Sequence, residues 1–131
     1  MKNTHRKQHS RSGATTVEFA FVVPIIFTMF LGAIELTRMN FIRQTAANAA
    51  YEGARKAIVP GNSASDAQTE AFRLLTNLGV RNGAGVVVNS TISRVTVTVT
   101  IPINQNSWGL TRFSGGFSVT QSCSLTLESL H

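Results

Sequence analysis

One uninterrupted apolar segment limits what this chain can fold into. Residues 19–34 (FAFVVPIIFTMFLGAI) contain no charged side chain, and extending the segment back to Ala14 adds Glu18 as its only charge. As a helix, sixteen residues reach roughly 24 Å and twenty-one residues roughly 31 Å, against about 30 Å for the hydrocarbon core of a bilayer. We therefore expect a transmembrane segment at about residues 14–34.

The charges on either side of this segment predict its orientation. Residues 1–13 form a basic leader without an acidic residue, whereas the twenty residues after the segment contain only Arg38 and Arg43 as cations. Because an excess of cations marks the cytoplasmic side of a span, we expect a single-pass membrane protein. Its N-terminus would be cytoplasmic and its C-terminal part extracytoplasmic. The leader cations are Lys2, Arg6, Lys7 and Arg11.

The charge distribution argues against a nucleic-acid-binding function. Twelve Lys and Arg residues against six Asp and Glu residues give a formal charge of +6. Four of the twelve cations belong to the leader, so the rest of the chain carries eight against six, or +2. A nucleic-acid-binding fold needs a basic face on its folded part. We expect no nucleic-acid partner.

The helical pattern does not stop where the apolar segment ends. No stop signal precedes Pro60-Gly61, so the sequence predicts one helix over residues 14–58, roughly 67 Å long if continuous. Pro24 is compatible with a spanning helix, whose neighbours can satisfy the freed carbonyl. The outer half has a stripe of mostly small residues, which lets the chain's own sheet or a partner helix approach closely. The stripe consists of Met39, Ile42, Ala46, Ala50, Gly53 and Ala57.

Residues 59–131 are expected to form a small extracytoplasmic α+β domain. After a loop at residues 60–64, Ser65 can cap a second helix with Gln68 as its third-position partner, and Gly79 can end that helix. Its predicted apolar face consists of Ala67, Ala71, Leu74, Leu75 and Leu78.

The remaining residues have strand patterns that predict a three-stranded antiparallel sheet. Residues 95–103 alternate valine or isoleucine with threonine, which is typical of a half-buried strand, and Pro102 marks its end or an edge. A preceding strand is predicted at residues 86–92, turned by Ser93-Arg94, and a third at residues 117–127. On the third strand one face would carry Phe117, Val119, Cys123, Leu125 and Leu127. A polar, glycine-rich loop with Trp108 separates the last two strands. The predicted fold class is α+β.

No constellation of residues in the sequence supports catalysis or metal binding. The only close pair of acids, Asp66 and Glu70, lies on one exposed face of the second predicted helix. The histidines His5, His9 and His131 offer no Ser-His-Asp arrangement, and the first two lack acidic or thiol co-ligands. Cys123 is the only cysteine and is expected to be a small buried residue. We expect no enzymatic activity, no metal and no cofactor.

Glu18 is not explained by a simple membrane anchor. A carboxylate costs on the order of 2.5–3.5 kcal/mol at a bilayer centre and less near its edge, so such residues usually have a partner. Cleavage after Gly13 would leave Ala14 with a free amine and make Glu18 the fifth residue of the mature chain. The segment RSG followed by ATTVEFAFVVP resembles a type IV prepilin processing site, with a basic leader, Gly before the cut and Glu at the fifth mature position.

The motifs along the first helix resemble the TadE-like pseudopilin family of tight-adherence (Tad, Flp) pilus systems. The resemblance covers roughly Arg11 to Ile58. The motifs that carry it are Ser12-Gly13-Ala14, Val17-Glu18-Phe19-Ala20, Pro24, Leu31-Gly32, Ile34-Glu35, Arg38, Asn48-Ala49-Ala50 and Glu52-Gly53-Ala54-Arg55. Major pilins of such systems usually carry Glu-Tyr where this chain has Glu18-Phe19, and they are shorter. The resemblance therefore favours a minor pseudopilin (minor pilin).

The resemblance implies a pseudopilin-like fold and a role in assembling a surface pilus for adhesion or biofilm formation. The implied partners are a prepilin peptidase, other pilins and pseudopilins, an inner-membrane assembly platform and membrane lipid. It assigns cleavage to Gly13 and Ala14, assembly to Glu18, and cytoplasmic retention of the leader to its four cations. The resemblance also implies that the mature protein is anchored in the inner (cytoplasmic) membrane, where it would stay or from which it would enter the pilus.

Two alternatives remain open from the residues. The apolar segment can be an ordinary signal of a periplasmic binding module, cut after Ala33, although Leu31 fits such a cleavage site poorly. The processing motif also suits a pseudopilin of a type II secretion or DNA-uptake machine. The mature N-terminal residue distinguishes the first alternative from a pilin.

Overall fold

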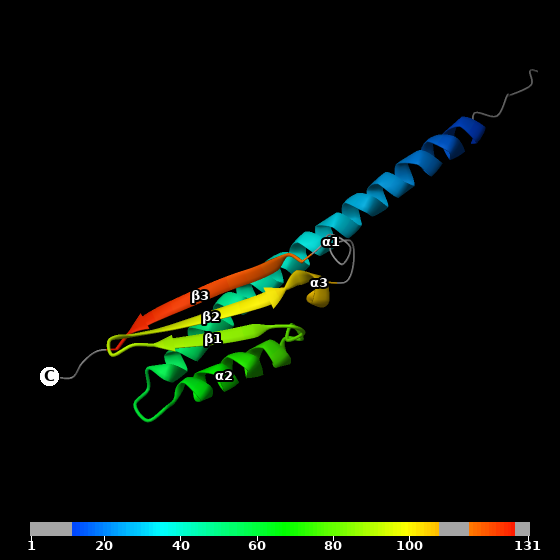
Figure 1. The fold of residues 1–131 in the computed structure, drawn as a ribbon. Coiled ribbons are helices and arrows are strands. Elements are labelled where there is room, and N and C mark those ends of the chain that lie inside the picture. Colours follow the sequence, from blue (N-terminus) through cyan, green and yellow to red (C-terminus); the bar gives the residue numbers. More distant parts are fainter. Residues whose placement is uncertain (1–11, 108–115, 128–131) are drawn as a thin grey trace, which may run out of the picture. The chain divides into compact units, whose positions relative to one another are not determined.

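The computed structural model of the chain describes residues 12–107 and 116–127. It divides into two compact units, Met1–Ala33 and Ile34–His131, which are considered separately. The elements follow in the order α1, α2, β1, β2, α3 and β3 (Figure 1). A long apolar helix followed by a small antiparallel sheet confirms the predicted α+β class.

Helix α1 spans Ser12–Ala57, 46 residues, close to the predicted range of 14–58. Pro24 lies inside it and cannot donate a backbone hydrogen bond, yet the helix continues on both sides. One turn later, the Thr28 hydroxyl donates to the Pro24 carbonyl over 2.8 Å. Arg55 and Lys56 occupy the last turn, where cations interact favourably with the negative end of the helix dipole.

Helix α2 spans Ala64–Asn77, and its N-cap is Ser63. The Ser63 hydroxyl accepts from the Asp66 N–H at 3.3 Å, and the Asp66 carboxylate accepts from the Ser63 N–H at 2.8 Å. The predicted cap of Ser65 with Gln68 is therefore wrong, because Ser65 already lies in the first helical turn. Gly79 adopts a φ of +68°, so the predicted glycine stop is confirmed.

The apolar face of α2 is shorter than predicted. Ala67, Ala71 and Leu75 are fully buried, and Leu74 packs partly buried against the core. Leu78 was predicted on this face, but it follows the last helical residue and is 40% exposed.

Strands β1 (Gly85–Ser90), β2 (Arg94–Pro102) and β3 (Ser118–Thr126) form an antiparallel sheet of order β1-β2-β3. Its register places Val97 opposite Val88 on one side and opposite Cys123 on the other. The three predicted strands and their antiparallel pairing are confirmed.

Two isoleucines predicted in strands lie outside them. The N–H and the hydroxyl of Thr91 both donate to the Arg94 carbonyl, at 2.8 and 2.9 Å, which closes a tight turn and leaves Ile92 fully exposed at its tip. Ile103 is buried, but it begins the short helix α3 (Ile103–Asn106), which the sequence analysis placed in a loop.

The sheet has a buried face and a hydroxyl-rich face. On β2 the buried residues are Val95, Val97, Val99 and Ile101, as the alternation predicted. On β3 the same face is only half-buried, and this includes Cys123, which was predicted to be buried. Phe117 precedes β3 and is 66% exposed, so its predicted place on this face is wrong.

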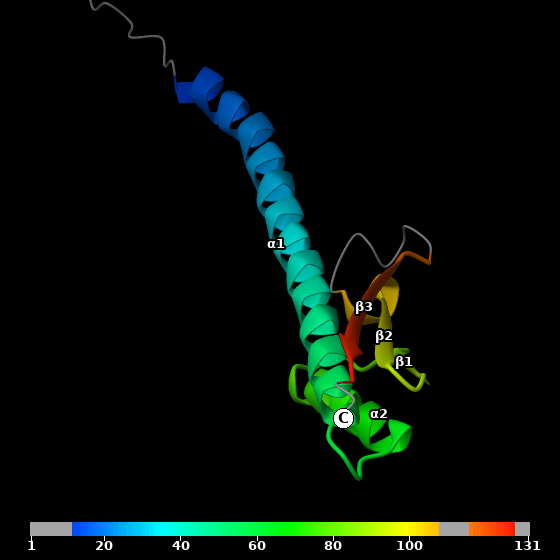
Figure 2. The same ribbon diagram turned by 90° about the vertical axis from the view of Figure 1, so that its left-hand side faces the viewer.

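The core joins the part of α1 after Ile34 to α2 and to the buried face of the sheet (Figure 2). The fully buried residues of α1 are Ile42, Ala46, Ala49, Ala50 and Ala54. A Cβ added at Gly53 would lie 3.2 Å from the Ala67 carbonyl oxygen and 3.3 Å from Val97 Cγ1. At Gly53, α1 thus approaches both α2 and β2 closely.

The capping geometry predicts different effects for two neighbouring serines. Ser63→Ala removes the acceptor for the Asp66 N–H and should lower the free energy of unfolding by about 1 kcal/mol, whereas Ser65→Ala should change it little. Chemical denaturation of the full chain in detergent micelles measures both. Equal losses, or a larger loss for Ser65→Ala, would contradict the assigned cap.

Candidate functional site

The residues of the proposed processing site lie at the start of α1. Gly13, Ala14 and Glu18 are helical and exposed, and a Cβ added at Gly13 would meet no described atom within 4 Å. The leader cations Lys2, Arg6, Lys7 and Arg11 lie outside the described residues, as do Trp108, His5, His9 and His131. The backbone around Gly13 and Ala14 is thus open within the part of the chain that the structure describes.

The first unit is an apolar helix whose large side chains are exposed. Phe21 is 73% exposed, Met29 71% and Phe19 69%, and the most apolar stretch of α1 has no buried residue. In water such a surface would be unfavourable, since apolar area costs about 25 cal/mol per Å². By length and composition, α1 is able to cross a membrane. Glu18 is the one charged side chain of residues 13–33.

The second unit begins with a polar cluster that the sequence analysis did not find. Glu35 is 9% exposed, and its carboxylate accepts a hydrogen bond from the Ser107 hydroxyl. One turn later, Arg38 Nε donates to the Asn106 carbonyl oxygen over 3.1 Å. We call these four residues, Glu35, Arg38, Asn106 and Ser107, the helix–loop clamp. It holds the end of α3 against the part of α1 that follows Ile34.

Asn106 connects this clamp to the sheet. It is 4% exposed, and its Nδ2 donates to the Asn82 carbonyl at 2.7 Å and to the Pro102 carbonyl at 2.9 Å. Nearby, the Ile103 N–H donates to the Phe117 carbonyl over 2.8 Å. The clamp therefore ties α1 to the loop before β1 and to the end of β2.

A signal for the clamp is present in the sequence, but it is weak. Glu35 and Arg38 are three residues apart at the end of the apolar segment, which places them on one face of the helix. Their partners lie more than sixty residues away in a segment of no regular pattern, and sequence spacing cannot supply that pairing.

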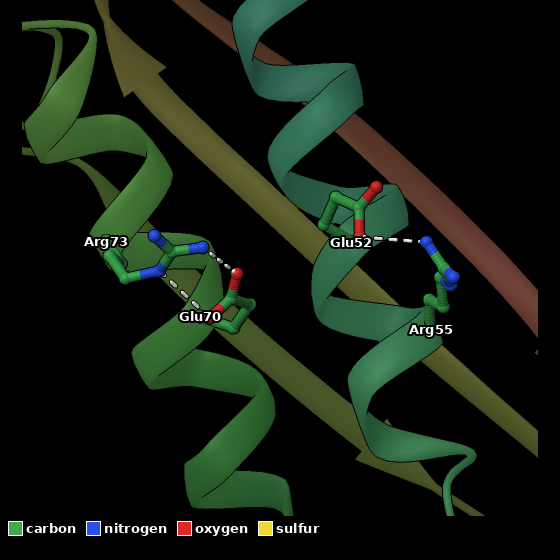
Figure 3. A network of polar contacts seen from close by, with 4 residues as sticks. All are labelled: Glu52, Arg55, Glu70 and Arg73. Carbon is green, nitrogen blue, oxygen red and sulfur yellow. Dashed lines mark hydrogen bonds and ion pairs between the residues drawn. The ribbon is translucent and has the colours of Figure 1, made fainter.

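The other acids that the structure describes in the second unit have structural roles. Glu52 pairs with Arg55 at 3.8 Å on α1, and Glu70 pairs with Arg73 at 2.5 Å on α2 (Figure 3). The hydrogen bond from Arg73 lowers the pKa of Glu70, and the hydrogen bond from Ser63 lowers the pKa of Asp66. Exposed pairs of this kind contribute little to stability. Asp66 therefore caps α2 and Glu70 pairs with Arg73, and the two carboxylates do not converge on a cleft.

The packing stripe predicted on α1 lies mostly toward the core. Ala46 and Ala50 are fully buried, Gly53 is buried, and Ala57 is half-buried. The described residues contain no group of three His, Cys, Asp or Glu side chains able to hold a metal ion.

Comparison with known proteins finds a family match within helix α1. The family model described as "TadE-like protein" matches residues 13–55, which lie within α1, and this confirms the resemblance seen in the sequence. The matched residues make up about a third of the chain. No curated protein and no solved structure was found to match the chain.

The helix–loop clamp predicts a stability effect at Ser107. Ser107→Ala removes a donor from a buried carboxylate and should lower the free energy of unfolding by roughly 1–3 kcal/mol. Ser90→Ala, at an exposed serine of β1, is the matched control and should be nearly neutral. Denaturant unfolding of the full chain compares the two variants. If Ser107→Ala is as stable as the unaltered chain and as Ser90→Ala, the clamp does not hold the domain together.

Proposed function

We propose that the chain is a minor pseudopilin that acts in assembly of a tight-adherence (Flp-type) pilus. The single observation that carries the proposal is the match of residues 13–55 to TadE-like proteins. In this proposal, residues 1–13 are a basic leader, residues 14–58 form the helix with its span at about 14–34, and residues 59–131 complete the extracytoplasmic domain. Its role is structural, in adhesion and biofilm formation.

In the proposed sequence of events, the chain is first inserted into the inner membrane. The leader cations keep the N-terminus in the cytoplasm, and the apolar half of α1 crosses the bilayer. A prepilin peptidase then cuts between Gly13 and Ala14. No described side chain or distant backbone atom lies within 4 Å of a Cβ added at Gly13, and this supports the step, because a protease needs an accessible backbone. The mature protein associates with other pilins and with the inner-membrane assembly platform.

Glu18 is proposed to act in assembly. After cleavage, the Ala14 amine lies about one helical turn from Glu18, and an unpaired charge is costly in lipid. We assign Glu18 to pairing with the Ala14 amine of a neighbouring subunit. The exposure of Glu18 on α1 supports this assignment, because a neighbour has access to its carboxylate.

The mature N-terminus tests the processing step. Mass analysis of the membrane-bound protein should find Ala14 at the N-terminus, and Gly13→Leu should leave the leader attached. Gly32→Leu is the control, since Gly32 is another glycine of α1 with nothing near its Cβ position. An N-terminus at Ile34 would instead identify a periplasmic module with a cleaved signal.

Glu18→Gln tests the assembly step. The variant should be cleaved and retained in the membrane, because the apolar segment is unchanged, but surface pili should be lost. Glu52→Gln, at a half-buried acid farther along α1 that pairs with Arg55, should leave piliation intact. Immunoblots of processing and membrane retention are read together with electron microscopy of pili. Normal piliation removes Glu18 from the mechanism, whereas loss of cleavage reassigns it to peptidase recognition.

A further inference from the structure

The loop between α2 and β1 contains an asparagine followed directly by a glycine, Asn82-Gly83, and both residues are exposed. The Ala84 N–H donates to the Arg81 carbonyl over 3.0 Å, which closes a turn around the pair. Gly83 has a φ of +66°, whereas φ is negative at Asn82. This is the geometry of a type II turn, with Asn82 and Gly83 at its two central positions.

An Asn-Gly pair contains both a nucleophile and an electrophile. The backbone nitrogen of the glycine can attack the side-chain amide carbon of the asparagine, because glycine has no Cβ to obstruct the approach. The nitrogen loses its proton, a C–N bond forms to the amide carbon, and the amide nitrogen leaves as ammonia. Water then opens the resulting five-membered imide at one of its two carbonyls. The product is aspartate or isoaspartate, and no electron is transferred.

The reacting groups of this pair are accessible in the fold. Among the residues that the structure describes, neither the Gly83 N–H nor the side-chain amide of Asn82 has a hydrogen-bond partner. The attacking nitrogen therefore gives up no hydrogen bond. Asn89 differs from Asn82, because it lies in β1, is paired with Thr96 of β2 and precedes a serine.

The fold requires glycine at position 83. A Cβ added there would collide with the Gln105 side chain and would lie 2.8 Å from Pro102 Cγ. The positive φ of Gly83 is also unfavourable for a residue with a side chain. The turn and the close contact with α3 thus depend on a residue that gives Asn82 no steric protection.

One hydrogen bond opposes the reaction. To close the ring, the Gly83 nitrogen must rotate about the Asn82 Cα–C bond until it lies beside the side chain, and this rotation moves the Asn82 carbonyl oxygen. In a type II turn the first central residue has a ψ of about +120°, which keeps the nitrogen away from Cβ. The Asn82 carbonyl accepts from Asn106 Nδ2 at 2.7 Å, and Asn106 is 4% exposed. Asn106 therefore holds Asn82 in an unreactive orientation.

We propose that Asn82-Gly83 is a site of spontaneous deamidation and that the hydrogen bond from Asn106 sets its rate. The isoaspartate product adds one methylene to the main chain of the loop. It also converts the carbonyl that Asn106 uses into a free carboxylate. The modification thus changes the contact by which the helix–loop clamp reaches the loop before β1.

Ageing of the purified full chain in detergent micelles, in a mildly alkaline buffer, tests the site. Trypsin releases residues 82–94 as one peptide, so tandem mass spectrometry compares Asn82 with Asn89 directly, against an unaged sample digested in the same way. The converted fraction should be larger at Asn82 at every time point. An isoaspartyl methyltransferase with a labelled methyl donor should label the aged, undigested chain. Asn82→Gln should remove this labelling, because its longer side chain must close a less favourable six-membered ring.

Asn106→Leu tests the restraint. The variant keeps a similar volume but has no donor for the Asn82 carbonyl, so conversion at Asn82 should be about 2- to 10-fold faster, the factor that one ordinary hydrogen bond supplies. Ser107→Ala is the matched control, because it weakens the same clamp and leaves the Asn106 side chain in place. Its rate should be close to that of the unaltered chain. If denaturant unfolding shows that Asn106→Leu is not folded, Asn106→Asp, which keeps the shape and lacks the donor, replaces it.

Three results overturn the proposal. The first is an unmodified Asn82 in the folded chain under conditions in which the same chain converts in urea, since the fold then closes the site. The second is equal conversion at Asn82 and Asn89. The third is a folded Asn106 variant that converts no faster than Ser107→Ala. None of these measurements depends on processing or piliation, so failure here is separate from failure of the proposed function.

Discussion

The fold depends on close contact between the outer half of α1 and the valines of β2. Ala46, Ala49, Ala50 and Ala54 are fully buried against the core that contains Val95, Val97 and Val99. Alanine loses no side-chain entropy on burial, and its small size lets a helix backbone come close to a sheet. At Gly53 even a methyl group would crowd α2 and β2. The separation of the two layers is thus set by the smallest residues of the helix.

The helix–loop clamp fixes the position of α1 along the sheet. A stripe of alanines presents similar surfaces at successive turns, so apolar contact alone determines poorly how far the helix slides along the sheet. Hydrogen bonds require particular partners at particular distances. Glu35 and Arg38 supply them one turn apart, to Ser107 and Asn106, and Asn106 is bonded in turn to Asn82 and Pro102. A shift by one turn would leave a buried carboxylate and a buried amide without these bonds, which is costly.

The sequence predicted the elements well because their signals are local. The alternation of valine and threonine in β2, the apolar segment of α1 and the glycine after α2 each follow from period or backbone preference. Prediction from the sequence failed where two residues could each form the same local structure, or where a residue's hydrogen-bond partner lies far away in the chain. Ser63 and Ser65 are both acceptable caps, and only the carboxylate of Asp66 at the third position decides for Ser63. Ile92 has strand character, yet the Thr91–Arg94 turn places it at the tip. The partners of Glu35 and Arg38 could not be predicted, since a loop of no regular pattern provides them.

The two halves of helix α1 differ in which side chains they bury. Its first half carries large apolar residues such as Phe21 and Met29, exposed over all faces, and this composition is stable only where the surroundings are themselves apolar. Its second half buries mostly small residues on one face, with Asn48, Tyr51 and Arg55 exposed on the other, as expected for a helix that packs against a sheet on one side only. The hydrogen bonds from α1 to the end of α3 begin at Glu35. An apolar surface exposed on all faces needs bulky residues without a preferred direction, whereas packing against a sheet needs small residues on one face and specific hydrogen bonds, and α1 contains both kinds of sequence.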